Sequence, residues 1–241
     1  ELFGHPGEDF PVIISLVGPE DDLSIQVHPD DEHAQKIGYK RGKNEAWFFI
    51  ESDPGASIVY GQKTKNKEEL QEMINQDKWD DIYKKYPVAD GDFVYLPAGC
   101  LHAMGKGNVV YEIQQSTDIT YRFYDYHRKD KDGNERELHL KQAIDCLSFD
   151  KDIDKNDVHP VVKVHENMKE TIFISNDSFT VSQLLVIGKC QYKCDNYQLA
   201  TVVKGSGKVD EYDVKVGDNF LIPTNTSIEL DGQMMIMMTT K

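Results

Sequence analysis

The sequence has few positive charges for its length. Its 241 residues include 27 Lys and Arg against 42 Asp and Glu, which gives a formal net charge of −15 at pH 7. A nucleic acid is bound through its phosphates by a basic surface, so this balance argues against a nucleic-acid partner. It does not exclude a small anionic substrate, because a few local cations can hold a phosphate group inside an acidic protein.

Long hydrophobic runs and a cysteine framework are also missing. No apolar run approaches the roughly 20 residues that span a bilayer, and no signal peptide is visible, so we expect no membrane partner. The cysteines are Cys100, Cys146, Cys190 and Cys194, and their spacing indicates no disulfide framework. Reduced thiols in a cytoplasmic protein are the expected state.

Short runs of Val, Ile, Tyr and Phe, separated by Gly, Pro, Asp and Asn, fill most of the chain. Such runs are typical of the strands of antiparallel barrels. In the first part of the chain they are PVIISLVG, LSIQVHP, EAWFFIE, ASIVYGQ, DFVYLPAG, NVVYEIQQ and ITYRFYDY. Residues 66–86 and 135–147 instead place apolar side chains at an approximately helical spacing. We therefore predict a mainly β protein with a small helical insertion at about 66–86 and a shorter helix within 135–147.

A polar and acidic stretch, SFDKDIDKNDVHP at 148–160, divides the chain, and we interpret it as a linker. Strand patterns resume after it. Two corners echo each other across it, GDFVYLPAGCLH at 91–102 and GDNFLIPTNTSI at 217–228. Each has a glycine, an acidic residue, an apolar run and a proline. The echo favours two related barrels, in domains 1–147 and 161–241, over one long sheet.

The first corner has the form G-x5-P-x-G-x2-H and ends on His102. All four fixed positions are similar to the second motif of the cupin superfamily of small jelly-roll β-barrels, so two cupin-type barrels are expected. The second corner has Asn225 in place of Gly99 and Ile228 in place of His102. We therefore expect the second barrel to be degenerate, to lack metal ligands and to bury Ile228.

Partners for His102 in a metal site occur earlier in the chain. Gln26 and His28 are two residues apart, so in a strand they project from the same face. Glu45 precedes the apolar strand that starts at Trp47. These four side chains supply an amide oxygen, two imidazoles and a carboxylate, which suit a divalent ion, with zinc first and iron, manganese or cobalt as alternatives. We predict one zinc ion per chain, with an open coordination position.

Four segments carry a resemblance to a known family. LSIQVHPDDEHA, GKNEAWFFI, GDFVYLPAGCLHAM and EIQQSTDITYRFYDY, in this order and spacing, closely resemble type I mannose-6-phosphate isomerase in its short bacterial form. The resemblance implies a zinc-dependent enzyme of two cupin barrels that interconverts mannose 6-phosphate and fructose 6-phosphate. It also implies that the family's four metal ligands fall on Gln26, His28, Glu45 and His102.

The same resemblance implies that Arg122 is the active-site arginine, and it matches Glu112 and Asp118 to acidic positions of the pocket. These three residues have even numbers and share a face wherever the strand runs regular. Lys43, which matches a pocket lysine, and Ser24 each stand two residues before a predicted ligand and are candidates for contacting substrate oxygens. The proton-transferring base is not unique, since Glu112, Asp118 and Lys43 all remain candidates.

Two other classes of protein fit the same barrel, because one fold hosts many functions. A cupin metal-dependent oxygenase usually carries a His-x-His pair where this chain has Gln26 and His28. A non-catalytic cupin sensor of sugar phosphates would need neither the four ligands nor Arg122.

The start and the assembly of the chain remain open at this level. The family begins upstream of the matched region with a segment that contains a Trp-Gly-Gly stretch, which this sequence, starting at Glu1, does not contain. We expect either a further upstream segment or a first barrel that is completed in another way. The sequence carries no signal of oligomeric state, and we expect a monomer, with a dimer as the alternative.

Overall fold

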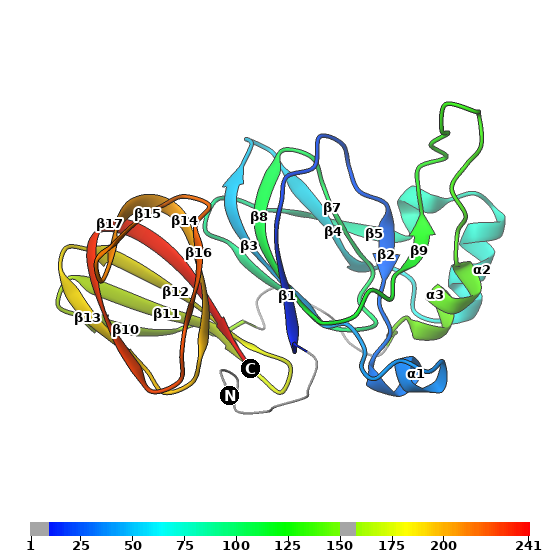
Figure 1. Ribbon diagram of the computed structural model, residues 1–241. Helices are drawn as coiled ribbons and strands as arrows, with labels where there is room; N and C mark the ends of the chain where they lie inside the picture. Colours follow the sequence, from blue (N-terminus) through cyan, green and yellow to red (C-terminus); the bar gives the residue numbers. More distant parts are fainter. Residues whose placement is uncertain (1–9, 150–157) are drawn as a thin grey trace. The chain divides into compact units, whose positions relative to one another are not determined.

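The computed structural model describes residues 10–149 and 158–241. Contacts divide the chain into two compact units, which we call the N-terminal unit (described residues 13–149) and the C-terminal unit (described residues 158–241, together with residues 10–12). Both consist mainly of antiparallel strands (Figure 1). The prediction of a mainly β fold is confirmed. Most of the predicted linker at 148–160 lies outside the described residues.

The N-terminal unit contains two sheets and a few short helices. One sheet has the strand order β1-β8-β3-β6 and the other the order β5-β4-β7-β2-β9. The strands are β1 (Val12–Val17), β2 (Ile25–Val27), β3 (Glu45–Ser52), β4 (Ser57–Gln62), β5 (Tyr83–Pro87), β6 (Phe93–Leu96), β7 (His102–Met104), β8 (Asn108–Gln115) and β9 (Tyr121–Tyr124). The helices are α1 (Asp31–Lys36), α2 (Lys67–Asn75), the 3-10 helix η1 (Trp79–Asp81) and α3 (Leu140–Cys146).

The two sheets of the N-terminal unit enclose a shared core. Trp47 and Phe49 of β3 belong to the same buried cluster as Ile58 of β4 and Met104 of β7, so strands of both sheets face it. Because side chains alternate along a strand, His102 projects in the same direction as Met104. The inner face of the five-stranded sheet therefore carries the histidine that the sequence analysis singled out.

The helices α2, η1 and α3 cover the outer face of the five-stranded sheet. A second buried cluster joins side chains of the strands to side chains of α2, η1 and α3; it includes Val59, Ala103, Phe123, Leu70, Trp79 and Ala143. In Figure 1, α2 and α3 accordingly lie beside the end of the unit that carries β9. Apolar burial on both faces makes this sheet a rigid base for the residues on its inner face.

The predicted helical insertion at 66–86 is correct in its first part and wrong in its last. Asn66 caps α2 by accepting the backbone N–H of Glu69, and the helix ends before Asp77, which has a left-handed φ of 56°. Residues from Tyr83 onward form the edge strand β5, because the segment pairs with β4 instead of continuing as a helix. The helix predicted within 135–147 is confined to α3.

The C-terminal unit is one continuous antiparallel sheet that curves around its own core. Its path is β10-β11-β12-β17-β14-β15, with β13 paired to β17 and β16 paired to β14. The strands are β10 (Val161–His165), β11 (Met168–Ser175), β12 (Thr180–Ile187), β13 (Cys190–Cys194), β14 (Gln198–Val209), β15 (Tyr212–Lys215), β16 (Asn219–Ile222) and β17 (Thr226–Thr240). β17 pairs with three strands, which allows the sheet to close around Leu184, Val202 and Ile236.

The two echoing corners have the same backbone form. Gly99 has a φ of 83°, and Asn225, which occupies the corresponding position, has a φ of 56°. Asn is among the residues that tolerate this left-handed region, so the substitution preserves the turn. Ile228 is buried, as predicted, and belongs to the core of the C-terminal unit.

Two further observations concern the cysteines and membrane-spanning helices. All four cysteines are free thiols. Within residues 10–149 and 158–241, no helix is long and apolar enough to cross a membrane.

Candidate active site

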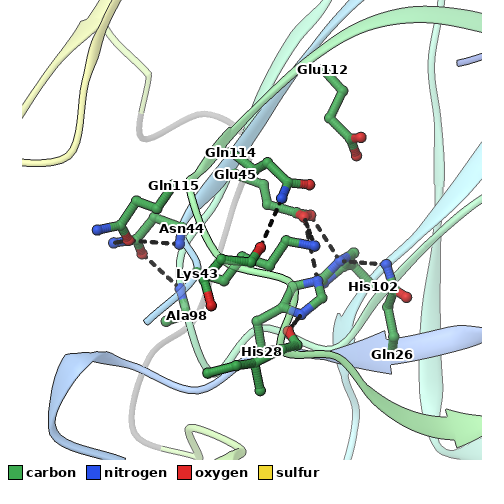
Figure 2. Close-up of polar contacts among 12 residues, drawn as sticks. Gln26, His28, Lys43, Asn44, Glu45, Ala98, His102, Glu112, Gln114 and Gln115 are labelled. Carbon is green, nitrogen blue, oxygen red and sulfur yellow. Dashed lines mark hydrogen bonds and ion pairs between the residues drawn. The ribbon is translucent and has the colours of Figure 1, made fainter. Parts of the chain in front are cut away.

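Three predicted metal ligands converge between the two sheets of the N-terminal unit. His28 follows β2, Glu45 is the first residue of β3 and His102 is the first residue of β7. One ligand atom of each lies within 4.8 Å of the others, and each residue is at most 2% exposed. Figure 2 shows the three side chains pointing toward one another. Residues from distant parts of the chain are therefore gathered around one point.

The hydrogen bonds of the two imidazoles determine which nitrogen faces that point. His28 Nδ1 donates to the carbonyl of Ile119 at 2.8 Å, and His102 Nδ1 donates to the carbonyl of Cys100 at 3.0 Å. A neutral imidazole with its proton on Nδ1 has its lone pair on Nε2. Both Nε2 atoms face Glu45, His28 at 3.4 Å from Oε1 and His102 at 3.2 Å from Oε2. Backbone carbonyls thus orient both rings as metal ligands.

The convergent atoms are short of hydrogen-bond donors. Within the described part of the chain, His28 Nε2 and Glu45 Oε2 are buried without a hydrogen-bond partner. Burial lowers the pKa of His28, which favours the neutral form. The pKa of Glu45 lies well below its usual range, although burial alone would raise it, so the group is a carboxylate. The lone pairs of the two imidazole Nε2 atoms and the Glu45 carboxylate surround one point, with few hydrogen-bond donors between them. Such an arrangement suits a divalent cation.

Gln26, the fourth predicted ligand, lies beside the cluster. It pairs with His102 across β2 and β7, so both side chains occupy the inner face. Its Nε2 lies 3.4 Å from His102 Nε2. A half-turn of the terminal amide exchanges Nε2 and Oε1, so the oxygen can reach the same point.

Lys43 contacts the cluster directly. Its Nζ lies 2.9 Å from Glu45 Oε1, and the residue is 7% exposed. Its spacing of two residues from Glu45 would place it on the same strand face, but it precedes β3 and does not lie on that strand. The long side chain nevertheless carries a cation into the site.

Glu112 lies on the same face of the four-stranded sheet as Glu45 and Trp47. It pairs with Trp47 across β8 and β3, and the Trp47 indole donates to Glu112 Oε1 at 2.8 Å. Burial raises the pKa of Glu112, and the charge of Glu45 raises it further. In Figure 2 its carboxylate is directed toward the side where Glu45 and His102 lie.

Arg122 lies on the other sheet. It pairs with Gln26 across β9 and β2, and its Nη1 donates to the carbonyl of Glu137 at 2.8 Å. Its Nε is buried and has no hydrogen-bond partner among the described residues. His139 is half-buried, and its Nδ1 accepts the Arg122 backbone N–H at 3.1 Å.

The expected common face of Glu112, Asp118 and Arg122 does not form. β8 ends at Gln115 and β9 begins at Tyr121 in the other sheet, so the segment is two strands joined by a loop. Asp118 is exposed in that loop. Ser24 precedes β2 and is half-buried, so it is not a strand neighbour of Gln26.

Two residues of the site were missed by sequence reasoning. Trp47 follows Glu45 by two residues, and alternation along β3 could have placed it on the same face. Asn44 stands between Lys43 and Glu45, and its side chain bonds to Ala98 and Gln115. Its partners come from distant segments, so the sequence gives no sign of them.

The fold and the site together define a two-barrel cupin protein with a candidate site for a divalent metal. A protein of Streptococcus mutans named mannose-6-phosphate isomerase is 38% identical over 244 residues, covering 98% of this chain and 76% of that protein. The chain belongs to the mannose-6-phosphate isomerase family.

Further comparisons agree with this assignment. The family model described as mannose-6-phosphate isomerase, cupin domain, matches residues 169–241. A mannose-6-phosphate isomerase of Bacillus subtilis is 37% identical over 232 residues, covering 92% of this chain and 72% of that protein. A crystal structure of the mannose 6-phosphate isomerase from Bacillus subtilis has a TM-score of 0.93 at 31% identity, covering 100% of this chain and 78% of that one.

Proposed function

We propose that this chain is a zinc-dependent isomerase that interconverts mannose 6-phosphate and fructose 6-phosphate. The observation that carries the proposal is the convergence of His28, Glu45 and His102 within 4.8 Å. This cluster occurs in a chain that is 38% identical to a protein named for that reaction. We further propose a monomer in the cytoplasm, in keeping with its free thiols, and a structural, metal-free role for the C-terminal barrel.

The donor set supports zinc as the metal. His28, His102, Glu45 and the amide oxygen of Gln26 would hold it. Imidazole and carboxylate ligands suit zinc, and a site with few charged ligands leaves a net positive charge. When bound, the ion would act as a Lewis acid toward the oxygens of the sugar at C1 and C2.

The reaction moves a proton between C2 and C1 of the sugar through a cis-enediol, so the chain must supply a base. We favour Glu112 as this base, because its carboxylate is directed toward the cluster and accepts a hydrogen bond from Trp47. Burial and Glu45 raise its pKa, which strengthens it as a base near neutral pH. Lys43 is paired with Glu45, and Asp118 is exposed, so both have weaker support.

Two cations of the chain can stabilise negative charge on the substrate. Lys43 lies at the cluster, where negative charge develops on the enediol oxygens. Arg122 lies opposite Gln26 and has a buried Nε without a partner in the described residues, so it retains a free donor for an anionic oxygen. An oxygen of either the phosphate or the enediol can accept a hydrogen bond from this Nε–H group. Ser24 remains a candidate for a neutral contact with the substrate.

A coupled assay with mannose 6-phosphate, with and without chelator, tests this proposal. We expect formation of fructose 6-phosphate that is lost with chelator and restored by zinc. Tight binding without turnover would support a sensor instead, and dioxygen consumption would support an oxygenase. Activity that survives complete removal of metal would refute the zinc-dependent mechanism.

Arg122→Ala probes the role of the arginine in the same assay. We expect the variant to keep its zinc, since Arg122 is not among the ligands, and to lose most of its turnover, by about 100-fold for the loss of a charged donor. Zinc content is measured by elemental analysis. A variant with full activity would show that the arginine assignment is wrong.

A further inference from the structure

A polar network adjoins the candidate metal site without reaching into it (Figure 2). Asn44 lies between Lys43 and Glu45 in sequence. Its side-chain Oδ1 accepts the backbone N–H of Ala98 at 2.8 Å, and its Nδ2 donates to Gln115 Oε1 at 2.9 Å. The Asn44 backbone N–H donates to the same Gln115 oxygen at 2.9 Å, and its carbonyl accepts the Gln115 N–H at 3.0 Å. The network therefore joins the start of β3, the end of β8 and the turn before β7.

The same turn is tied to the third ligand segment. The backbone N–H of Gly99 donates to the carbonyl of His28 at 2.8 Å. The turn at residues 97–100 therefore bonds on one side to the neighbour of Glu45 and on the other side to His28 itself, and it leads directly into His102. Hydrogen bonds of two adjacent turn residues thus link the backbones that carry all three convergent ligands.

The roles of the two amides in this network are fixed by their partners. The Ala98 N–H requires an acceptor, so it faces the oxygen of Asn44, and the nitrogen of Asn44 must then face Gln115. Gln115 presents its oxygen, because it also receives the backbone N–H of Asn44. Gln115 is 7% exposed. Asn44 is half-buried, and the network has one arrangement of donors and acceptors, which restricts its conformation.

We propose that Asn44 is a positioning residue of the metal site, whose amide sets the distance between Glu45 and His102 through the Ala98 turn. The inference deepens the proposed function, since it rests on binding of a divalent ion by these ligands. The side chain of Asn44 bonds to Ala98 and Gln115, neither of which is a candidate metal ligand. Substitution of Asn44 should therefore change the metal affinity, because ligand atoms that move apart no longer coordinate one ion well.

Matched substitutions separate this role from general stability. Asn44→Asp keeps the oxygen that accepts the Ala98 N–H. It replaces the Nδ2 donor by a second oxygen, which then faces the Oε1 oxygen of Gln115. Gln115→Glu keeps the side-chain oxygen that accepts both N–H groups of Asn44, so this substitution should preserve the network. Asn108→Asp is the control for the loss of a buried amide, since Asn108 is 1% exposed in β8 and donates to Gly105 and accepts from Ser52, away from the ligands.

The measurements are the zinc dissociation constant of each folded variant, by competition with a chromogenic chelator, and the unfolding midpoint of each apoprotein. We expect Asn44→Asp to weaken zinc binding by about 10- to 100-fold, as outer-shell substitutions do. Gln115→Glu and Asn108→Asp are expected to bind zinc like the unsubstituted protein, although Asn108→Asp lowers the midpoint. If Asn44→Asp does not fold, Gln115→Leu, which removes the acceptor and leaves Asn44 intact, is expected to weaken zinc binding as well.

The outcomes distinguish the inference from the function beneath it. Unchanged zinc affinity in folded Asn44→Asp or Gln115→Leu, with a lowered midpoint as in Asn108→Asp, would overturn the inference alone. Failure of the unsubstituted protein to bind any divalent ion would overturn the proposed function and the inference with it. Zinc binding without isomerase activity would remove the isomerase assignment and leave the inference standing.

Discussion

At the scale of single residues, the indole of Trp47 connects the candidate base to the candidate metal ligands. Its N–H bonds to Glu112, while its ring lies edge-on to His102 with centroids 5.6 Å apart. Burial and Glu45 raise the pKa of Glu112, and the bond from Trp47 lowers it. Trp47 thus both orients the carboxylate and limits how basic it becomes.

Trp47→Phe removes this bond and retains most of the ring. We expect turnover to fall by about 10- to 100-fold, since a hydrogen bond to a charged group contributes about 1.5–3 kcal/mol. A base acts in its deprotonated form, so activity rises as pH rises through the pKa of Glu112. Loss of the bond raises that pKa, and the rising limb of the pH profile should move to higher pH with KM unchanged.

The other tryptophan supplies the control for this prediction. Trp79 also donates its indole N–H to a carboxylate, that of Asp77, at 2.6 Å, but it lies in η1 outside the site. Trp79→Phe should therefore leave the pH profile in place. An identical limb in Trp47→Phe and the unsubstituted protein would exclude Glu112 as the base that Trp47 tunes.

At the scale of elements, the loop after β9 is held by one buried carboxylate. Asp125 is 4% exposed and bonds to Arg136 through Oδ2 at 2.7 Å and Oδ1 at 2.5 Å, and to Arg128 as well. Burial alone would raise the pKa of Asp125, but the hydrogen bonds from Arg136 and Arg128 lower it. The loop that follows carries Glu137, which binds Arg122 through its carbonyl.

Asp125→Asn is expected to lower the free energy of unfolding by about 1–3 kcal/mol at pH 7, as for lost hydrogen bonds to charged groups. A carboxyl whose pKa is lowered by folding stabilises the protein above its unfolded value, near pH 4, and loses this effect as pH falls through the folded value. The difference between the variant and the unsubstituted protein should therefore shrink below about pH 4. Urea unfolding at several pH values measures it.

An exposed carboxylate provides the comparison for Asp125. Asp145 contacts Lys67 at 3.3 Å, and both side chains are about half exposed. Asp145→Asn should change the free energy of unfolding by less than about 1 kcal/mol, because water screens surface pairs. Equal effects of the two substitutions would mean that the Asp125 pairs do not stabilise the loop.

The two echoing corners give a second prediction at this scale. A Cβ on Gly99 would lie 3.0 Å from the carbonyl oxygen of Cys146 and 3.3 Å from Ser148, so this corner needs space as well as a left-handed φ. Gly99→Asn, which copies Asn225, should therefore lower the free energy of unfolding by about 1–3 kcal/mol through overpacking. Asn225→Gly should change it only slightly. Thermal unfolding of both variants decides whether the close approach or φ alone selects glycine.

At the scale of the whole molecule, all candidate ligands belong to the N-terminal unit. A bound ion stabilises the part of a protein that binds it, so the two units should respond differently to its removal. We expect one zinc per chain by elemental analysis. Chelation should increase hydrogen exchange in peptides from residues 13–149 and leave peptides from residues 158–241 unchanged, as measured by mass spectrometry. Two ions per chain would contradict the proposal that the C-terminal barrel binds no metal.

Local patterns in the sequence determined most of the elements and the composition of the site. Val- and Ile-rich runs bounded by turn residues predicted the strands, and the G-x5-P-x-G-x2-H pattern singled out His102. The convergent residues His28, Glu45 and His102 had already been selected by their side-chain chemistry. These features depend on neighbours within a few residues, so a single sequence carries them.

Only the tertiary structure decided which distant groups meet. The loop at 116–120 moves Arg122 to a different sheet from Glu112 and leaves Asp118 exposed, although alternation suggested a common face. The bonds of Trp47 to Glu112 and of Asn44 to Ala98 join residues 65 and 54 positions apart. Strand register and loop path set such contacts, and both arise from packing of the whole sheet, which no local pattern specifies.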